Sequence, residues 1–155
     1  MKIHRFRTED AKEVSSLIKN NFIKLDLGGH TQEGIRLQIK GNNPKNLIKR
    51  SKYIDYFVSI DKNKVTGICG YDREKIHTLF VDIHYHGKGI GRQLLEKVIE
   101  EGKKKGVKNF KTLSTFYAEG FYIKSGFKRI RELSFPEETR DIILIEMEKT
   151  YTSIC

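Results

Sequence analysis

The feature that most constrains this sequence is a glycine-rich segment between an apolar run and an amphipathic stretch. Residues 79–83 are typical of a β-strand, and from Ile90 onward apolar residues recur at helical spacing. Between these two stretches, Gly87, Gly89 and Gly91 occupy three of five positions. Glycines let a backbone approach an anion closely, and the first turn of a helix adds unpaired N–H groups and a partial positive charge. The segment therefore predicts a strand–turn–helix unit that binds a phosphate group, most simply a pyrophosphate.

Two common nucleotide-binding motifs do not explain this turn. Lys88 and Arg92 add positive charge to it, but a Walker loop reads Gly-x-x-x-x-Gly-Lys-Ser/Thr, whereas here Gly89 follows Lys88 and Asp82 stands at the first-glycine position. The dinucleotide-binding motif needs glycines spaced by two and then by three, whereas these are spaced by two throughout. Judged from the glycine pattern alone, a glycine-rich connection that binds no ligand remains the alternative to a phosphate-binding turn.

Residues 79–95 resemble the acetyl-CoA-binding signature of the general N-acetyltransferase superfamily (GNAT). That signature reads Gln/Arg-x-x-Gly-x-Gly/Ala after a strand that often reads Leu-x-Val-x-Pro. Gly89 and Gly91 match the two small positions, His86 stands where Gln or Arg is usual, and Ile83 replaces the frequent Pro. Neither difference removes a backbone N–H donor from the turn.

The resemblance implies that acetyl-CoA binds along this segment as a co-substrate, with no metal. The pantetheine arm would pair with the backbone of residues 79–81 like an added strand, and a bulge there would turn the Val81 N–H toward the thioester carbonyl. The candidate cofactor-binding residues are Leu79, Phe80, Val81, Gly87, Lys88, Gly89, Ile90, Gly91, Arg92 and Thr115. Thr115 stands where many members carry an asparagine that contacts the cofactor.

A second motif lies downstream, at residues 118–127. It resembles the Ala-x-x-Phe-Tyr-x-Lys-x-Gly-Phe stretch that follows the next strand in the same superfamily. By this resemblance Tyr122 donates a proton to the departing thiolate of CoA. A thiol pKa of ~8.5 makes that a modest requirement. The alternative is that Tyr122 is an aromatic packing residue with a solvated hydroxyl.

The acceptor poses the harder proton problem. A primary amine with a pKa of ~10.4 is protonated at pH 7, and freeing its lone pair costs roughly 4–5 kcal/mol. A base, or a water chain leading to one, is therefore expected near the thioester. His77 is our candidate because some amine-acetylating members place a histidine there and its ordinary pKa of ~6.5 suits the task. A histidine hydrogen-bonded within the sheet is the alternative.

Other titratable residues receive weaker assignments. We expect Asp72 and Glu74 to lie solvated in a turn, and His84 and His86 to support the glycine-rich loop. Cys69 is expected to be a small buried packing residue, so transfer would be direct within a ternary complex. By resemblance, the acceptor pocket lies between the first two helices and their connecting loop, near the residues Asp26, His30 and Glu33.

The order of elements predicts an α/β (α+β) fold in one domain spanning residues 1–155. We expect a mixed, mostly antiparallel, twisted sheet of about six to seven strands flanked by about four helices. Strands are expected near residues 56–60, 65–71, 76–83, 110–115, 127–133 and 141–148. Helices are expected near residues 8–22, 33–52 with an interruption before Pro44, from 90 to about 102 or 106, and 118–124. Residues 2–17 resemble the first strand and helix of the superfamily.

Composition limits the class of protein further. The longest uncharged apolar run is far too short to span a membrane, and two cysteines do not form a disulfide framework, so we expect a cytoplasmic protein. The net charge of +10 favours anionic partners, yet the basic residues are interleaved with acids. The leading hypothesis is an N-acetyltransferase that acts on an amine of unknown identity. An acyl-CoA sensor without turnover and, less favoured, a basic nucleic-acid-binding module remain alternatives, and a homodimer stays open.

Overall fold

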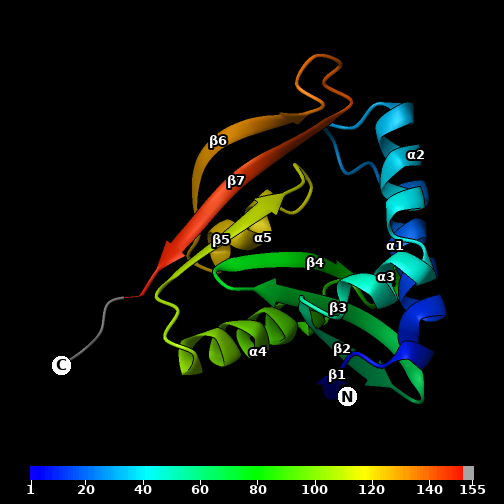
Figure 1. Ribbon diagram of the computed structural model, residues 1–155, viewed down its shortest axis with the longest axis vertical. Helices are drawn as coiled ribbons and strands as arrows, with labels where there is room; N and C mark the ends of the chain where they lie inside the picture. The colour runs from blue at the N-terminus through cyan, green and yellow to red at the C-terminus, as the bar shows by residue number, and fades with distance from the viewer. Residues whose placement is uncertain (152–155) are drawn as a thin grey trace.

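The computed structural model describes residues 1–151 and contains one seven-stranded sheet (Figure 1). The strands are β1 (Lys2–Arg5), β2 (Asp55–Asp61), β3 (Lys64–Asp72), β4 (Lys75–Val81), β5 (Asn109–Ser114), β6 (Lys128–Phe135) and β7 (Ile142–Thr150). Their spatial order is β1-β2-β3-β4-β5-β7-β6, and every adjacent pair is antiparallel except β4–β5. The predicted mixed, mostly antiparallel sheet is confirmed.

The helices are α1 (Ala11–Lys24), α2 (Gln32–Gly41), α3 (Pro44–Arg50), α4 (Ile90–Lys104) and α5 (Glu119–Lys124). There are five instead of about four because the second helical stretch is divided. The Asn43 side chain accepts a 2.8 Å hydrogen bond from the N–H of Asn46, and Pro44 occupies the first turn, so a new helix starts there.

Two apolar clusters occupy the two faces of the sheet. The buried side of α4, including Leu94, Leu95 and Val98, packs against one face. The buried side of α1 packs with Leu47 of α3 against the other face. Figure 1 shows α4 and the α1–α3 group on different sides of the strands. The helices thus cover both faces of the central strands β3 and β4.

The sheet splits between β4 and β5. These strands pair only at Lys75–Lys111 and Ile76–Thr112, and Figure 1 shows them diverging beyond that point. The part of β4 at Leu79–Val81 consequently has no strand partner on its β5 side. An unpaired strand edge presents N–H and C=O groups to whatever occupies the gap.

The predicted strand over residues 76–83 was too long at its end. β4 stops at Val81, and Ile83 lies in a short 3₁₀ turn, Ile83–Tyr85. The side chain of Asp82 accepts a 2.9 Å hydrogen bond from the N–H of His84, which competes with continuation of the strand. The turn predicted around Asp72 and Glu74 is confirmed. Among residues 1–151, no helix has both the length and the apolar character needed to cross a membrane.

Candidate active site

A cleft of about 1340 Å³ lies where β4 and β5 diverge. Its walls come mainly from β4, β5, the turn before α4, α4 itself and α5. All ten candidate cofactor-binding residues line this β4–β5 cleft, and so does Tyr122. His77 is not among the residues that line it. The cleft therefore gathers both sequence motifs while leaving the candidate base outside its wall.

A bulge interrupts β4 beside the cleft. The pairing of β3 with β4 shifts between Ile68 and Gly70, and Thr78 adopts a left-handed backbone conformation with φ 56°. The N–H of Asp82 donates a 2.8 Å hydrogen bond to Thr66 on β3. Because backbone groups alternate in direction along a strand, the N–H and C=O of Val81 point away from β3, toward the side that lacks a strand. This is the orientation that the expected bulge would give to the Val81 N–H.

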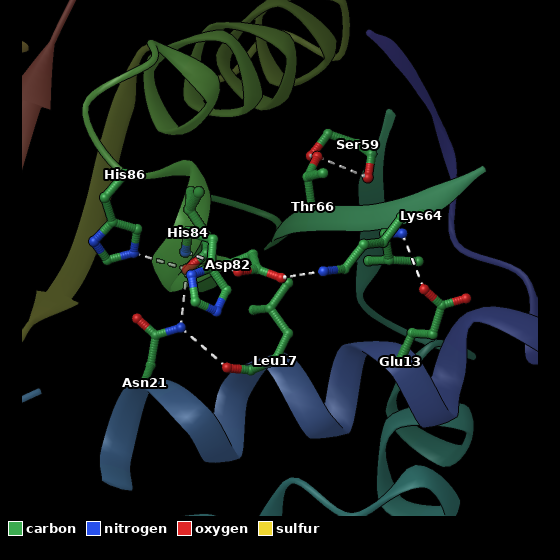
Figure 2. Close-up of polar contacts among 11 residues, drawn as sticks. Glu13, Leu17, Asn21, Ser59, Lys64, Thr66, Asp82, His84 and His86 are labelled. Atoms are coloured by element: carbon green, nitrogen blue, oxygen red, sulfur yellow. Dashed lines mark hydrogen bonds and ion pairs between the residues drawn. The ribbon is translucent and has the colours of Figure 1, made fainter. Parts of the chain in front are cut away.

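Two side chains hold the Val81 carbonyl in place (Figure 2). Nδ2 of Asn21, on α1, donates to it at 2.9 Å and also donates to the Leu17 carbonyl at 3.0 Å. Nε2 of His86 lies 2.8 Å from the same oxygen. Since a carbonyl only accepts, Nε2 of His86 carries a hydrogen, and His86 supports the loop as predicted. Asn21 was missed, although a buried asparagine on the apolar side of α1 was a detectable signal.

The turn before α4 exposes backbone donors. Gly89 precedes α4 with φ 82°, a conformation that favours glycine, and no side chain caps the helix. The N–H of Gln93 bonds to the Gly89 carbonyl at 3.1 Å. Within the described part of the chain, the N–H groups of residues 90–92 have no acceptor. Together with the side chains of Lys88 and Arg92, they make a cationic end of the cleft that suits a pyrophosphate.

Tyr122 is buried in the wall of the cleft. Its ring packs edge-on against Phe121 and Phe127, with centroid distances of 5.3 and 5.4 Å. Burial raises the pKa of Tyr122 well above its ordinary value, so the hydroxyl keeps its proton at neutral pH. Burial likewise raises the pKa of the Cys69 thiol, and the expectation of a buried packing cysteine is confirmed.

Thr115 lines the cleft and also shapes it. Its Oγ1 accepts a 3.1 Å hydrogen bond from the N–H of Ala118, which holds the backbone between β5 and the start of α5. The hydroxyl hydrogen of Thr115 is still available to donate.

The remaining titratable candidates lie elsewhere. His77 pairs with Gly70 on β3, and its pKa is lowered first by burial, while Asp72 opposes the change. Asp72, Glu74 and His84 do not line the β4–β5 cleft either. Asp26 and His30 line a separate pocket of about 330 Å³ at the end of α1. Glu33 pairs with Arg36, whose Nε donates to its carboxylate at 2.8 Å.

No metal site accompanies these groups in the described residues. Among residues 1–151, His, Cys, Asp and Glu side chains do not gather in threes that could hold a metal ion. Cys155 lies outside the described residues.

Comparison with known proteins places the chain in a family. Residues 30–151 match the family model described as "Acetyltransferase (GNAT) domain". An uncharacterized N-acetyltransferase of Chlorobaculum tepidum is 28% identical over 141 residues, which cover 88% of this chain and 81% of the relative.

Solved structures share the fold. A GCN5-related N-acetyltransferase from Rhodopseudomonas palustris has a TM-score of 0.87 at 14% identity and covers 96% of this chain and 94% of its own. The PaiA N-acetyltransferase from Thermoplasma acidophilum, solved in complex with coenzyme A, has a TM-score of 0.77 at 21% identity over 97% of this chain and 98% of its own. The family match covers most of the sequence and includes both motifs of the cleft. The chain therefore belongs to the GNAT acetyltransferase family and is an acyl-CoA-dependent N-acetyltransferase.

Proposed function

We propose that this protein transfers an acetyl group from acetyl-CoA to a primary amine by direct attack in a ternary complex. One observation carries the proposal: the unpaired edge of β4 and the unpaired amides at the start of α4 open onto the same cleft. A strand edge suits an extended amide-containing arm, and a cationic helix start suits a diphosphate. Coenzyme A contains both groups, and it is bound in the PaiA relative.

The backbone of Val81 has a specific part in this mechanism. Acetyl-CoA supplies an activated carbonyl, and attack by the amine makes its oxygen negative. The Val81 N–H, turned away from β3 by the bulge, is our candidate donor to that oxygen. Asn21 and His86 hold the Val81 carbonyl and so limit movement of this residue. A fixed donor is effective because it needs no reorganisation during the reaction.

Tyr122 is our candidate acid for the departing thiolate. Its hydroxyl is protonated at neutral pH because burial raises its pKa, and its side chain lines the cleft. A thiolate takes up a proton readily, so a neutral phenol is sufficient for this role. Cys69 takes no part in the mechanism because its buried thiol is not ionised at neutral pH.

Removal of the amine proton requires a base or a path leading to one. His77 stays our candidate, although its side chain does not line the cleft. Burial keeps the imidazole unprotonated at neutral pH, which is the state that can accept a proton.

A ligand screen followed by turnover tests the proposal. Acetyl-CoA and CoA at about a hundred times their dissociation constants should stabilise the protein by about 2.7 kcal/mol, whereas ATP and NAD should not. Release of free CoA thiol is then measured with tyramine, putrescine, kanamycin and a peptide that begins with alanine. Stabilisation by ATP or NAD alone would contradict the proposed co-substrate. Absence of amine-dependent thiol release over a wider set of amines would contradict acetyl transfer.

A further inference from the structure

Buried polar side chains gather where the sheet packs against α1 and α3, and of these only His77 has a role in the mechanism so far. Three residues there carry a buried polar atom without a hydrogen-bond partner in residues 1–151: the Tyr56 hydroxyl on β2, Nε2 of His77 on β4 and Nε of Arg50 at the end of α3. The guanidinium of Arg50 lies near enough to both other residues to affect their protonation. Burying unpaired polar atoms is unfavourable, so three of them close together call for an explanation other than stability.

The strand register places Tyr56 and His77 in one row across the sheet. Tyr56 pairs with Gly70 on β3, and Gly70 pairs with His77 on β4. A Cβ added at Gly70 would come within 2.8 Å of Cε1 of Tyr56. The Tyr56 ring therefore lies over Gly70, between its own strand and His77. Glycine at this position makes room for the ring.

Thr78 connects this row to the β4–β5 cleft. It is the left-handed residue of the β4 bulge, with φ 56°, and it lines the cleft. Such a conformation is rare for a β-branched residue. Burial raises the pKa of Tyr56, and the Thr78 hydroxyl lies close enough to the phenol to oppose that rise. Tyr56 is thus close to Thr78, which lines the cleft, and lies in the same cross-strand row as His77.

We propose that Tyr56 is a positioning residue that connects the cleft to His77, so that His77 can take the proton of the acceptor amine. The proposal rests on the proposed function. An N–H bond of the ammonium breaks, and the hydroxyls of Thr78 and Tyr56 each accept one proton and release another. Waters bridge the Tyr56 hydroxyl to the Thr78 hydroxyl on one side and to Nε2 of His77 on the other, because neither the Tyr56 hydroxyl nor Nε2 has a hydrogen-bond partner in residues 1–151. A new N–H bond forms at Nε2, and the imidazolium later returns the proton to solvent.

The charges around His77 suit this role. Burial lowers its pKa, Lys75 and Arg50 lower it further, and Asp72 opposes them. The imidazole is therefore neutral at neutral pH, the state that can accept a proton, and the imidazolium that forms gives its proton up readily. Tyr56 itself stays protonated because burial raises its pKa.

Tyr56→Phe tests the proposal with little change in shape. The ring over Gly70 stays, and only the unpaired hydroxyl is lost. We expect kcat for the best amine of the panel to fall at least about tenfold, as for loss of a proton-transfer group. The KM for acetyl-CoA should stay within about twofold. A purely structural tyrosine would give the opposite pattern: unchanged kcat and equal or higher stability, because a buried unpaired hydroxyl is removed.

Tyr71→Phe is the matched control. The Tyr71 hydroxyl is also buried and unpaired in the described chain, but its side chain belongs to the cluster on the α4 face of the sheet. We expect kcat of this variant to equal that of the wild type within about twofold.

His77→Gln and the double variant complete the experiment. If Tyr56 acts through His77, the two losses of kcat should not multiply, since each breaks the same path. In the wild type, kcat should fall on the acid side of the pH profile as His77 becomes protonated, at a pH below the ordinary imidazole pKa. This fall should be absent in both single variants. A Tyr56→Phe variant that keeps wild-type kcat between about pH 5.5 and 9 overturns this proposal alone. A wild type that binds acetyl-CoA in calorimetry but acetylates no amine overturns the proposed function as well.

Discussion

Asn21 of α1 donates a 2.9 Å hydrogen bond to the carbonyl of Val81 at the unpaired edge of β4. The bond joins a helix near the N-terminus to the strand that carries the proposed oxyanion donor, across 60 residues of sequence. Figure 2 shows Asn21 pointing from α1 toward the loop that His86 braces from the other side. The geometry of the cleft edge thus depends on a side chain outside both sequence motifs.

Asn21→Asp should destabilise the fold and weaken the site. The substitution keeps the size of the side chain but replaces its donor with a carboxylate that faces the carbonyls of Val81 and Leu17. We expect a loss of about 1–3 kcal/mol in the free energy of unfolding, measured by urea denaturation. Asn20→Asp is the control, because Asn20 is the preceding residue of the same helix and is exposed. Equal stability of the two variants would show that the Asn21 bond contributes nothing.

Gly89→Ala should weaken acetyl-CoA binding. Gly89 has φ 82°, so alanine costs about 1–2 kcal/mol of backbone strain, and its methyl group would stand at the anion-binding turn. We expect the dissociation constant for acetyl-CoA, measured by calorimetry, to rise at least about tenfold.

Gly106→Ala provides the control for that strain. Gly106 has φ 87° in the turn after α4, away from the cleft, and no atom lies within 4 Å of an added Cβ. It should lose similar stability without losing affinity. A similar drop in affinity in both variants would attribute the effect to general destabilisation.

Tyr122→Phe should lower kcat and leave acetyl-CoA binding unchanged. Removal of a positioned acid typically costs about 10²-fold or more, while the ring would still pack between Phe121 and Phe127. Because the pKa of Tyr122 is raised, wild-type kcat should show no loss of this acid up to about pH 10. Tyr53→Phe, on an exposed side chain, is the control. Full activity of Tyr122→Phe would leave Tyr122 only its packing role.

Protonation of His77 should destabilise the folded protein in mild acid. The folded pKa of His77 is lowered, so as pH falls through its ordinary value of ~6.5 the unfolded chain binds the proton first. Stability should be unaffected by this residue above that value, and should decrease below it until His77 protonates in the folded state as well. The urea midpoint of the wild type should therefore fall more between about pH 7.5 and 5.5 than that of His77→Gln. His4→Gln, which removes a histidine from β1, is the control and should behave like the wild type. A larger fall in the midpoint of His77→Gln than in that of the wild type would contradict the predicted direction.

The sequence alone determined the parts of the site that are made by local backbone. Gly87 and Gly89 supply the left-handed backbone of the turn. The apolar spacing from Ile90 onward specifies the helix that follows, whose first amides have no partner and face the turn. The second motif likewise placed Tyr122 on a short helix. These features depend on residues within one or two turns of each other, so a local pattern is sufficient to predict them.

The tertiary structure alone decided which side chains meet. His77 was chosen by its position in the chain, yet strand alternation and the bulge at Thr78 direct it away from the cleft lining and into line with Gly70 and Tyr56. Asn21 reaches Val81 only because α1 packs across β4. Strand register and bulges arise from pairing between distant segments, and a shift of one residue moves a side chain to the other face of the sheet. For this reason the anion-binding turn could be predicted from the sequence, whereas the route by which the amine loses its proton could not.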